Sequence, residues 1–131
     1  MDAKRLRDVP LFARLSKHDL AMVAQMADEV DVREGEVLAR EGDVGHEFFV
    51  IERGRAEVTR DGERLAELGP GDFFGEMALI SEERRTATVT ALDAMRCVVM
   101  AGQAFRGLKR NQPAVYETVR AEVTKRQAQP A

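Results

Sequence analysis

Short apolar segments separated by glycine-containing turns fill the middle of the chain, and this pattern restricts the fold more than any other feature. Between about residues 30 and 100, apolar and polar side chains alternate in short runs. Turns recur at Gly35, Glu41–Gly45, Asp61-Gly62 and Gly69–Asp72. Turn signals about 8 to 12 residues apart are typical of antiparallel sandwiches and rolls. We therefore predict an antiparallel β-structure for this region.

Several runs in the region have the alternation or the apolar composition of strands. Phe48–Ile51 is strongly apolar, and Asp61-Gly62 is a hairpin signal. We expect strands on both sides of that hairpin, with Ala56, Val58, Leu65 and Leu68 as their apolar positions. The other predicted strands are Val30–Val32, Val37–Leu38, Thr88–Leu92 and Met95–Met100.

Helical patterns flank the predicted strands at both ends of the chain. Residues 3–30 read as helical, with a break at Pro10 and Ser16 as the N-cap of the second helix. Near the C-terminus, Phe105 and Leu108 predict one short helix, and a longer helix begins close to Pro113. The fold class is therefore α+β, mainly β, because helices and strands occupy separate parts of the chain.

Composition restricts the function classes. The chain has 131 residues, the length of one domain, and a net charge of −3, which argues against a nucleic-acid-binding surface. No apolar run is long enough to span a bilayer, and the charged N-terminus has no signal peptide. The single cysteine, Cys97, lies in an apolar run and predicts a buried thiol in a protein of the reducing cytoplasm.

One stretch, Phe74 to Val89, carries residues that suit an anion site. It reads FGEMALISEERRTATV, with Gly75-Glu76 near its start and Arg85-Thr86 near its end. The apolar run between them has the length of about one helical turn. An acid, a cation and backbone amides at the start of a short helix can hold a small anion that also carries hydroxyl groups. From the residues alone, this predicts a site for a phosphorylated sugar or a nucleotide.

The same stretch resembles the phosphate-binding cassette of cyclic nucleotide-binding domains. That family includes catabolite activator proteins, regulatory subunits of cAMP-dependent protein kinase and nucleotide-gated channels. Its pattern is roughly F-G-E-x-A-L followed by R-[STA]-A, and every position is present here. Gly42 to Gly54 resembles a second signature of the family, G-D-x-G-x-x-F-[FY]-V-[IV]-x-x-G. The resemblance covers roughly residues 8–126.

The resemblance implies a single domain over residues 1–131, built as an antiparallel jelly roll of eight strands, also called a double-stranded β-helix or β-roll. N-terminal helices would occupy residues 1–29, the roll residues 30–101 with the cassette at 74–89, and two C-terminal lid helices residues 102–127. We expect residues 127–131 to be a frayed tail.

The resemblance also implies roles for the charged residues of the cassette. Arg85 would pair with the exocyclic oxygens of a cyclic phosphate, and its neighbour Arg84 would point outward. Glu76 would accept a hydrogen bond from the ribose 2′-hydroxyl. Thr86 would reach the phosphate or the purine edge, which is compatible with both cAMP and cGMP. From the residues alone, Arg85 could equally be a surface arginine and Glu76 an acid that stabilises a helix N-terminus.

The remaining predicted ligand-binding residues lie before, within and after the cassette. Gly75 and Ala78 would act through their backbones, and Met77 belongs to the same segment. Val58 and Leu65 would line the apolar side of the base pocket, although each is also a normal core position. In the C-terminal lid, Tyr116 would stack on the base and Arg120 would lie over its face.

These features predict a cyclic nucleotide sensor that prefers cAMP, with cGMP as a second ligand and with no cofactor. The expected partners are the nucleotide and an effector protein or a second copy of the chain, with no nucleic acid. Met1 at the start of a complete domain favours a stand-alone form. The alternatives are a jelly-roll scaffold that has lost its ligand and a metal-dependent enzyme of the cupin type. The enzyme would need clustered histidines, and the chain has only His18 and His46.

Overall fold

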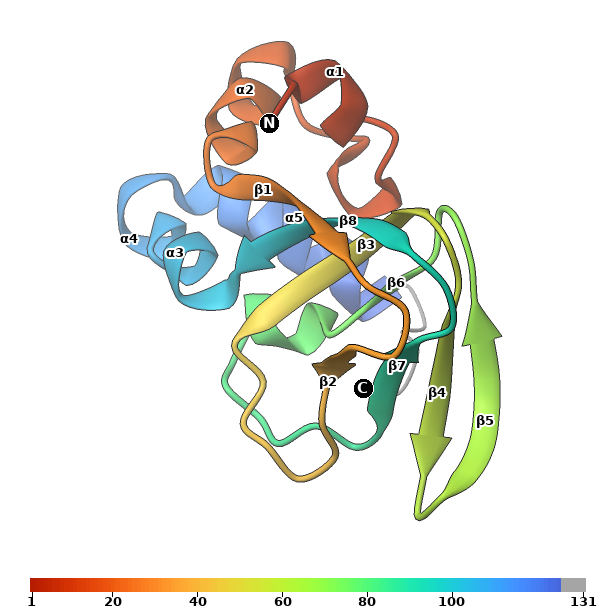
Figure 1. The fold of residues 1–131 in the computed structure, drawn as a ribbon. Coiled ribbons are helices and arrows are strands. Elements are labelled where there is room, and N and C mark those ends of the chain that lie inside the picture. Colours follow the sequence, from red (N-terminus) through yellow and green to blue (C-terminus); the bar gives the residue numbers. More distant parts are fainter. Residues whose placement is uncertain (126–131) are drawn as a thin grey trace.

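Two antiparallel sheets of four strands each form a β-roll in the computed structural model, which describes residues 1–125 (Figure 1). The first sheet has the order β1-β8-β3-β6 and the second the order β2-β7-β4-β5. The predicted jelly roll is confirmed. The first sheet contains β1 (Ala27–Val32), β8 (Met95–Ala101), β3 (Glu47–Arg53) and β6 (Phe73–Phe74). The second contains β2 (Val37–Ala39), β7 (Thr88–Ala91), β4 (Ala56–Arg60) and β5 (Glu63–Leu68).

Most of the helices gather on one side of the roll, next to the first sheet (Figure 1). Ser16 caps α2 as predicted, because its hydroxyl accepts a hydrogen bond from the Asp19 amide at 3.1 Å. Pro113 is the first residue of α5, also as predicted. The helices are α1 (Ala3–Leu6), η1 (Pro10–Phe12), α2 (Lys17–Ala24), η2 (Glu76–Leu79), α3 (Gly102–Arg106), α4 (Leu108–Asn111) and α5 (Pro113–Lys125), where η denotes a 3-10 helix.

Two predicted boundaries are wrong. The N-terminal helical region ends at Ala24 rather than near residue 30, because β1 begins at Ala27 and pairs with β8 from its first residue. Near the C-terminus, Phe105 and Leu108 do not share one helix. They lie in α3 and α4, which are separated at Gly107, a residue type that weakens helices. The predicted end of the lid, at residue 127, and the predicted tail lie outside the described residues.

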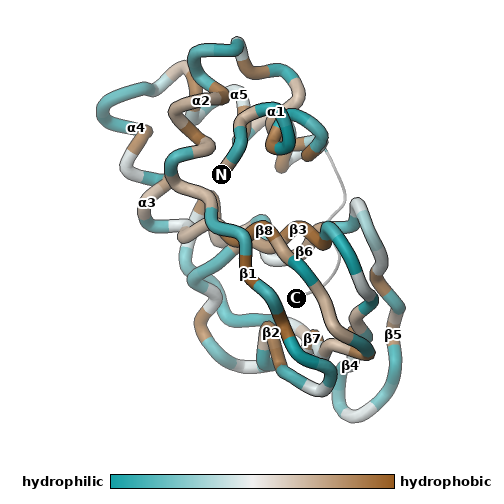
Figure 2. The backbone as a smooth tube through the Cα atoms, turned by 45° about the horizontal axis from the view of Figure 1, so that its top comes forward, coloured by the Kyte–Doolittle hydropathy of each residue, from teal (hydrophilic) through white to brown (hydrophobic). Residues whose placement is uncertain are grey.

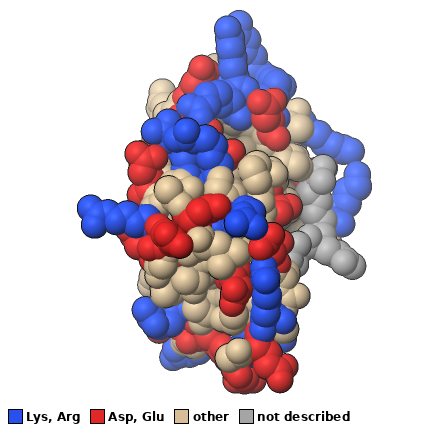
Figure 3. Space-filling model, turned by 45° about the vertical axis from the view of Figure 1, so that its right-hand side comes forward, with Lys and Arg blue, Asp and Glu red and all other residues tan. Residues whose placement is uncertain are grey.

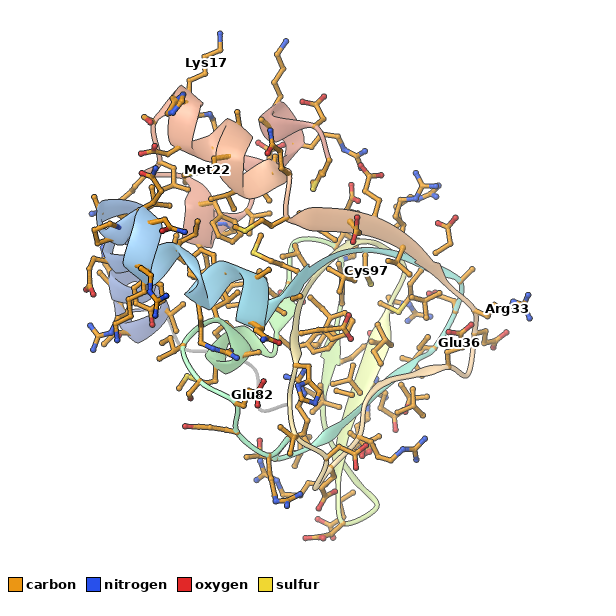
Figure 4. The ribbon with its side chains drawn as sticks, turned by 90° about the vertical axis from the view of Figure 1, so that its left-hand side faces the viewer. Lys17, Met22, Arg33, Glu36, Glu82 and Cys97 are labelled. Carbon is orange, nitrogen blue, oxygen red and sulfur yellow. The ribbon has the colours of Figure 1, made fainter. Side chains whose placement is uncertain are left out.

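The strongly apolar strand β3 separates two hydrophobic cores. Side chains alternate along a strand, so Phe48 and Val50 face the helical layer while Phe49 and Ile51 face the second sheet. Figure 2 shows this apolar backbone running between the helices and the rest of the roll. Cys97 in β8 is fully buried in the core between the sheets (Figure 4), and burial raises the pKa of its thiol to about 11. The predicted buried thiol is confirmed.

The hairpin turn predicted at Asp61-Gly62 is present, and the surface carries charges of both signs. Asp61 and Gly62 both have left-handed backbone angles, φ +53° and +81°, which suit the predicted tight hairpin between β4 and β5. Figure 3 shows acidic and basic side chains intermixed on one face. Within residues 1–125, no helix has the length and apolar character needed to cross a membrane.

Candidate anion-binding site

Gly75 is the residue of the predicted cassette at which the short helix η2 begins. It follows β6, takes a left-handed φ of +74° and is the N-cap of η2. A Cβ built on Gly75 would lie 2.7 Å from the Glu47 carbonyl oxygen and even closer to Nη1 of Arg85. Only glycine combines this backbone angle with such close neighbours. The backbone of Gly75 therefore lies directly against the Arg85 guanidinium.

Arg85 is buried, with 9% of its surface exposed, and its guanidinium occupies a narrow slot. Nη2 donates a hydrogen bond to the Glu47 carbonyl at 2.6 Å. On another side of the slot lies Gly45, where a Cβ would be 2.9 Å from Cζ of Arg85. Burial lowers the pKa of Arg85, while the carboxylates of Glu47 and Glu76 oppose that change. The result is a fixed, partly desolvated cation.

The backbone of Arg85 joins the two sequence signatures. Its amide donates to the Asp43 carbonyl at 2.7 Å, and its carbonyl accepts from the Gly42 amide at 2.9 Å. The segment from Gly42 therefore sets the position from which the arginine side chain enters the slot. Two stretches about 40 residues apart, each recognised separately in the sequence, form one structure.

Glu76 is the second buried charged residue of the cassette, with only 3% of its surface exposed. Its Oε2 has no hydrogen-bond partner among residues 1–125. Burial raises the pKa of Glu76 to about 7, against the opposing effects of its own backbone N–H and of Arg85. A buried oxygen without a partner is costly, so a hydroxyl donor placed here would be strongly favoured.

The neighbours of Arg85 in the sequence lie at the surface. Arg84 is exposed and donates to the Gly42 carbonyl at 2.7 Å, so its predicted outward orientation is confirmed. Thr86 is also exposed, and its carbonyl accepts a hydrogen bond from Nε of Arg60 at 2.8 Å. Of the two adjacent arginines, only Arg85 enters the slot beside Gly75.

The two residues predicted for the base pocket have different environments. Val58 is fully buried in the core between the sheets, and Leu65 on β5 is 44% exposed. The β4–β5 register shifts between Val58 and Thr59, which leaves Leu65 without a register partner on β4. Val58 thus serves the core in this structure, while Leu65 presents apolar surface to solvent.

The short helix η2 packs against α3 through the backbone of Ala78. Ala78 is buried, its amide donates to the Gly75 carbonyl at 3.0 Å, and its carbonyl accepts from Nη1 of Arg106. A Cβ on Gly102 would collide with that same carbonyl oxygen. Met77, in contrast, is 41% exposed. The predicted segment is therefore packed on α3 on one side and open to solvent at Met77.

The residues predicted for the lid lie on α5. Tyr116 is buried and stacks on Phe105, with 5.8 Å between ring centroids, so the structure places it in the helical core. Arg120 is about half exposed and lies 3.8 Å from the carboxylate of Glu117. Tyr116 shares this core with Leu79 of the cassette, while Arg120 pairs with a residue of its own helix.

Sequence reasoning missed three contributors to this site. The sequence places Gly45 in a turn and in the second signature, but its φ in the structure is not left-handed, so glycine is needed there for the close approach of Arg85. The sequence does not distinguish a glycine needed for a close approach from a glycine needed for a turn. The other two contributors are the Glu47 carbonyl and Arg106, and neither can be predicted from the sequence. Every residue has a backbone carbonyl, so the residue type at position 47 indicates nothing about it. The contact of Arg106 depends on how α3 packs.

The structure offers no metal centre in its described part. Within residues 1–125, no group of three or more His, Cys, Asp or Glu side chains could hold a metal ion. The two histidines of the chain lie in different places, His18 in α2 and His46 just before β3. Nothing in this arrangement favours the cupin-type enzyme.

Known proteins share both the sequence and the fold. Residues 29–112 match the profile of the cyclic nucleotide-binding domain. A cAMP-dependent protein kinase regulatory subunit from Blastocladiella emersonii is 36% identical over 108 residues, which cover 79% of this chain and 27% of the relative. The N-terminal domain of a transcriptional regulator from Streptomyces coelicolor A3(2) has a TM-score of 0.79 and 30% identity, over 95% of this chain and 91% of that chain.

A third similarity concerns the fold alone. The co-crystal structure of the regulatory domain of Toxoplasma gondii PKA with cAMP has a TM-score of 0.75 and 23% identity, over 95% of this chain and 49% of that chain. The chain spans only 22% to 34% of the length of curated relatives. The profile match nevertheless covers more than half of the chain and includes both signatures. This chain therefore belongs to the cyclic nucleotide-binding domain family.

Proposed function

We propose that this domain binds a cyclic nucleotide at the Gly75–Arg85 slot, prefers cAMP to cGMP, and acts as a regulatory sensor. The observation that carries the proposal is the pair of buried charged side chains next to the left-handed Gly75: Glu76 follows it in the chain, and the Arg85 guanidinium lies against its backbone. As a member of its family the domain is regulatory rather than catalytic. The preference for cAMP rests on the cAMP-dependent kinase subunit that is 36% identical, since Thr86 suits either base.

In this proposal Arg85 binds the phosphate. Its guanidinium is already oriented by the Glu47 carbonyl and lies against the Gly75 backbone, so a phosphate placed at Gly75 meets it directly. A planar guanidinium can donate two parallel hydrogen bonds to phosphate oxygens. The anion would also compensate a cation whose pKa is lowered by burial. The Ala78 amide would have to turn from the Gly75 carbonyl toward the ligand.

Glu76 supplies the acceptor for the ribose 2′-hydroxyl. The ionised carboxylate is the better acceptor, and burial raises the pKa of Glu76 to about 7 in the empty domain. A hydrogen bond from the ribose hydroxyl to Oε2 would favour the ionised form of Glu76, so ligand binding would release a proton near neutral pH. Affinity should therefore rise as the pH increases through about 7.

The proposed signal is a movement of the C-terminal helices. Arg106 of α3 donates to the Ala78 carbonyl and lies 3.3 Å from Glu82, which follows η2 (Figure 4). A shift of η2 toward a bound phosphate would change both contacts and so displace α3 and the helices after it. The ligand must bind one arrangement of the helices better than the other for this to work. An effector protein or a second copy of the chain would read the change, in the cytoplasm.

Calorimetric titration with cAMP, cGMP and a cyclic dinucleotide tests the proposal. Arg85→Ala should reduce cAMP affinity by about 100-fold, since charge-assisted hydrogen bonds to a desolvated partner are lost. Arg84→Ala removes an adjacent but exposed arginine and should bind like the wild type. Circular dichroism and thermal unfolding establish that both variants are folded. Equal affinity in Arg85→Ala and the wild type would reject the site, and no binding heat in the wild type would favour the scaffold alternative.

A further inference from the structure

The segment between β8 and the first turn of α5 carries positive charges only. Residues 102–116 contain three cationic side chains, Arg106, Lys109 and Arg110, and no acidic residue. The whole chain has a net charge of −3, so this basic segment belongs to an acidic protein. α3 and α4, which contain the three cations, lie on the side of the domain that faces the viewer in Figure 4. Solvation alone can account for cations on a helix surface, so a binding site requires that they also share a hollow and lack acidic partners.

The three cations line one hollow around the junction of α3 and α4. Its volume is about 650 Å³, equal to the share of roughly 20 water molecules in the liquid. Gly107, at the junction, adds no side chain between the cations on its two sides. The hollow is therefore wide enough for several side chains of a peptide and wider than one inorganic anion needs. It is lined by Arg106, Gly107, Lys109, Arg110 and Asn111.

Two of these cations are already oriented by the protein. Nη1 of Arg106 donates to the Ala78 carbonyl. Nζ of Lys109 lies over the ring of the buried Tyr116, 5.8 Å from its centroid. A side chain that is already held loses less conformational freedom when an anion binds it. Arg110 follows Lys109 directly and is exposed, so both charges are available to one anionic ligand.

The acidic side chains that pair with the lining residues leave this charge unbalanced. Within residues 1–125, Glu82 is the one acidic residue that does so, at 3.3 Å from Arg106. Glu82 is itself shared, because Nδ1 of His46 lies 3.6 Å from the same carboxylate oxygen. Three positive lining charges and one negative charge sum to +2 with His46 neutral. Among the described residues, neither Lys109 nor Arg110 takes part in an ion pair.

The helices packed against α3 and α4 do not supply the missing negative charge. α5 packs against α4, and its exposed acid, Glu117, lies 3.8 Å from Arg120 of the same helix, so this pair adds no net charge. The other acid of α5, Glu122, is buried and pairs with Arg14. η2 packs against α3, and its one acid, Glu76, is buried in the cassette. The hollow thus has a positive charge that the described part of the chain does not compensate.

We propose that the hollow at the α3–α4 junction binds an acidic segment of a partner protein. The carboxylates of that segment accept hydrogen bonds from Lys109 and Arg110, and the side-chain amide of Asn111 is a neutral donor for its backbone carbonyls. Exposed charges of this kind steer association and set its salt dependence more than they add affinity. A weak complex that salt dissociates is therefore expected.

Other polyanions fit this surface less well. Sites for single-stranded nucleic acids use aromatic side chains for stacking, and none of the described residues that line the hollow is aromatic. The net charge of −3 also repels a nucleic acid or an anionic membrane at long range. A helix that lies in a membrane surface needs exposed large apolar side chains beside its cations. Within residues 1–125 the exposed large apolar residues are Val30, Val37, Val44, Leu65 and Met77, none of them in α3 or α4.

This surface lies on helices that move in the proposed function. An acidic segment bound here would belong to the effector that reads the movement. That role rests on the proposed function, whereas binding of the segment does not, because no lining residue belongs to the cassette at 74–89.

Nuclear magnetic resonance titration of the nucleotide-free domain tests the proposal with the peptide acetyl-Glu-Gly-Glu-Gly-Glu-amide. Saturable shifts should appear at the amides of Gly107, Lys109, Arg110 and Asn111. The affinity should fall at least about fivefold when the salt concentration rises from about 0.02 M to about 0.2 M. The neutral peptide acetyl-Gln-Gly-Gln-Gly-Gln-amide should produce no saturable shift there. Equal shifts with the neutral peptide, or shifts spread over the whole surface, would overturn the proposal.

Variants assign the binding to the hollow. Lys109→Gln combined with Arg110→Gln should weaken binding of the acidic peptide about tenfold, since two charged contacts are lost. Arg33→Gln combined with Arg40→Gln removes the same charge from exposed positions of the roll, and Figure 4 shows Arg33 far from α3 and α4. This matched control should bind like the wild type. If the first variant fails to fold, Arg110→Gln alone should weaken binding about threefold. Wild-type affinity in a folded variant of the hollow, or equal weakening in the control, would reject the site.

Three other anions test the assignment to an acidic protein segment. Inorganic phosphate, octathymidylate and vesicles of phosphatidylcholine with about one-fifth phosphatidylserine should each bind more weakly than the acidic peptide under the same salt conditions. Tighter binding of the oligonucleotide or the vesicles at these helices would overturn the assignment, and so would phosphate with the affinity of the peptide. A wild-type domain that does not bind the acidic peptide would reject the proposal and would leave the nucleotide site unaffected.

Discussion

Replacing Glu76 by glutamine should stabilise the empty domain at neutral pH. Burial raises the pKa of this carboxyl from 4.5 to about 7, so the folded protein keeps a proton that the unfolded chain releases. The contribution to the free energy of unfolding is fully present below about pH 4.5 and is lost as the pH rises to about 7. Glutamine cannot ionise and should not show this loss.

The size of the effect follows from the change in pKa. The full difference corresponds to about 3 kcal/mol, and about 2 kcal/mol of it falls between pH 5 and pH 7. This is a substantial share of the stability of an ordinary domain. The same substitution should weaken cyclic nucleotide binding, because the neutral amide is a weaker acceptor for the ribose hydroxyl.

Urea unfolding at pH 5, 6, 7 and 8 measures the effect. The difference between Glu76→Gln and the wild type should grow with pH, while the dependence of stability on urea concentration stays the same. Glu63→Gln, an exposed position on β5, controls for the general loss of one negative charge. A difference between Glu76→Gln and the wild type that is constant with pH would refute the reasoning. The same pH trend in Glu63→Gln would also refute it.

Three further substitutions or reactions test the geometry. Gly75→Ala should lower the free energy of unfolding, measured with urea, by more than about 2 kcal/mol, because strain at φ +74° adds to collisions with neighbouring atoms. Gly62→Ala, at φ +81° but in open space, should lower it by only about 1 kcal/mol. Equal losses would contradict the close approach of Arg85. Gly102→Ala should push α3 from the Ala78 carbonyl and speed hydrogen exchange in residues 76–79, while Gly107→Ala, where the nearest atom is 3.2 Å away, should not. Cys97, whose pKa is raised to about 11, should react with iodoacetamide at least about 100-fold more slowly in the folded protein than in urea, and comparable rates would contradict its burial.

The sequence predicted the parts of the fold in which local pattern and tertiary environment agree. Phe48–Ile51 is apolar at every position because β3 has a core on each face, and this composition predicts a strand from the sequence alone. The start of β1 cannot be predicted from the sequence, because Asp28 to Asp31 are exposed along one edge of the sheet and lack the alternation of a half-buried strand. Only its pairing with β8 makes that segment a strand.

Prediction of the candidate site had a similar limit. The spacing of Glu76 and Arg85, together with the resemblance, indicated two side chains that the structure does bury in one segment. Their individual roles toward a ligand stay predictions. The acceptor that orients Arg85 is a backbone carbonyl of β3, and the contact of Arg106 with η2 arises from helix packing. Neither kind of contact can be read from residue identities.

The slot around Arg85 depends on the absence of side chains at Gly45 and Gly75. A methyl group at Gly45 or at Gly75 would occupy the space of the guanidinium, and a shorter side chain at position 85 would leave that space empty. Any one of three single changes is therefore enough to disable the slot. A buried guanidinium and two glycines contribute little to folding stability. A cation held in a fixed, buried position at a cost in stability is what one expects of a charge that serves binding, which is the role proposed for Arg85.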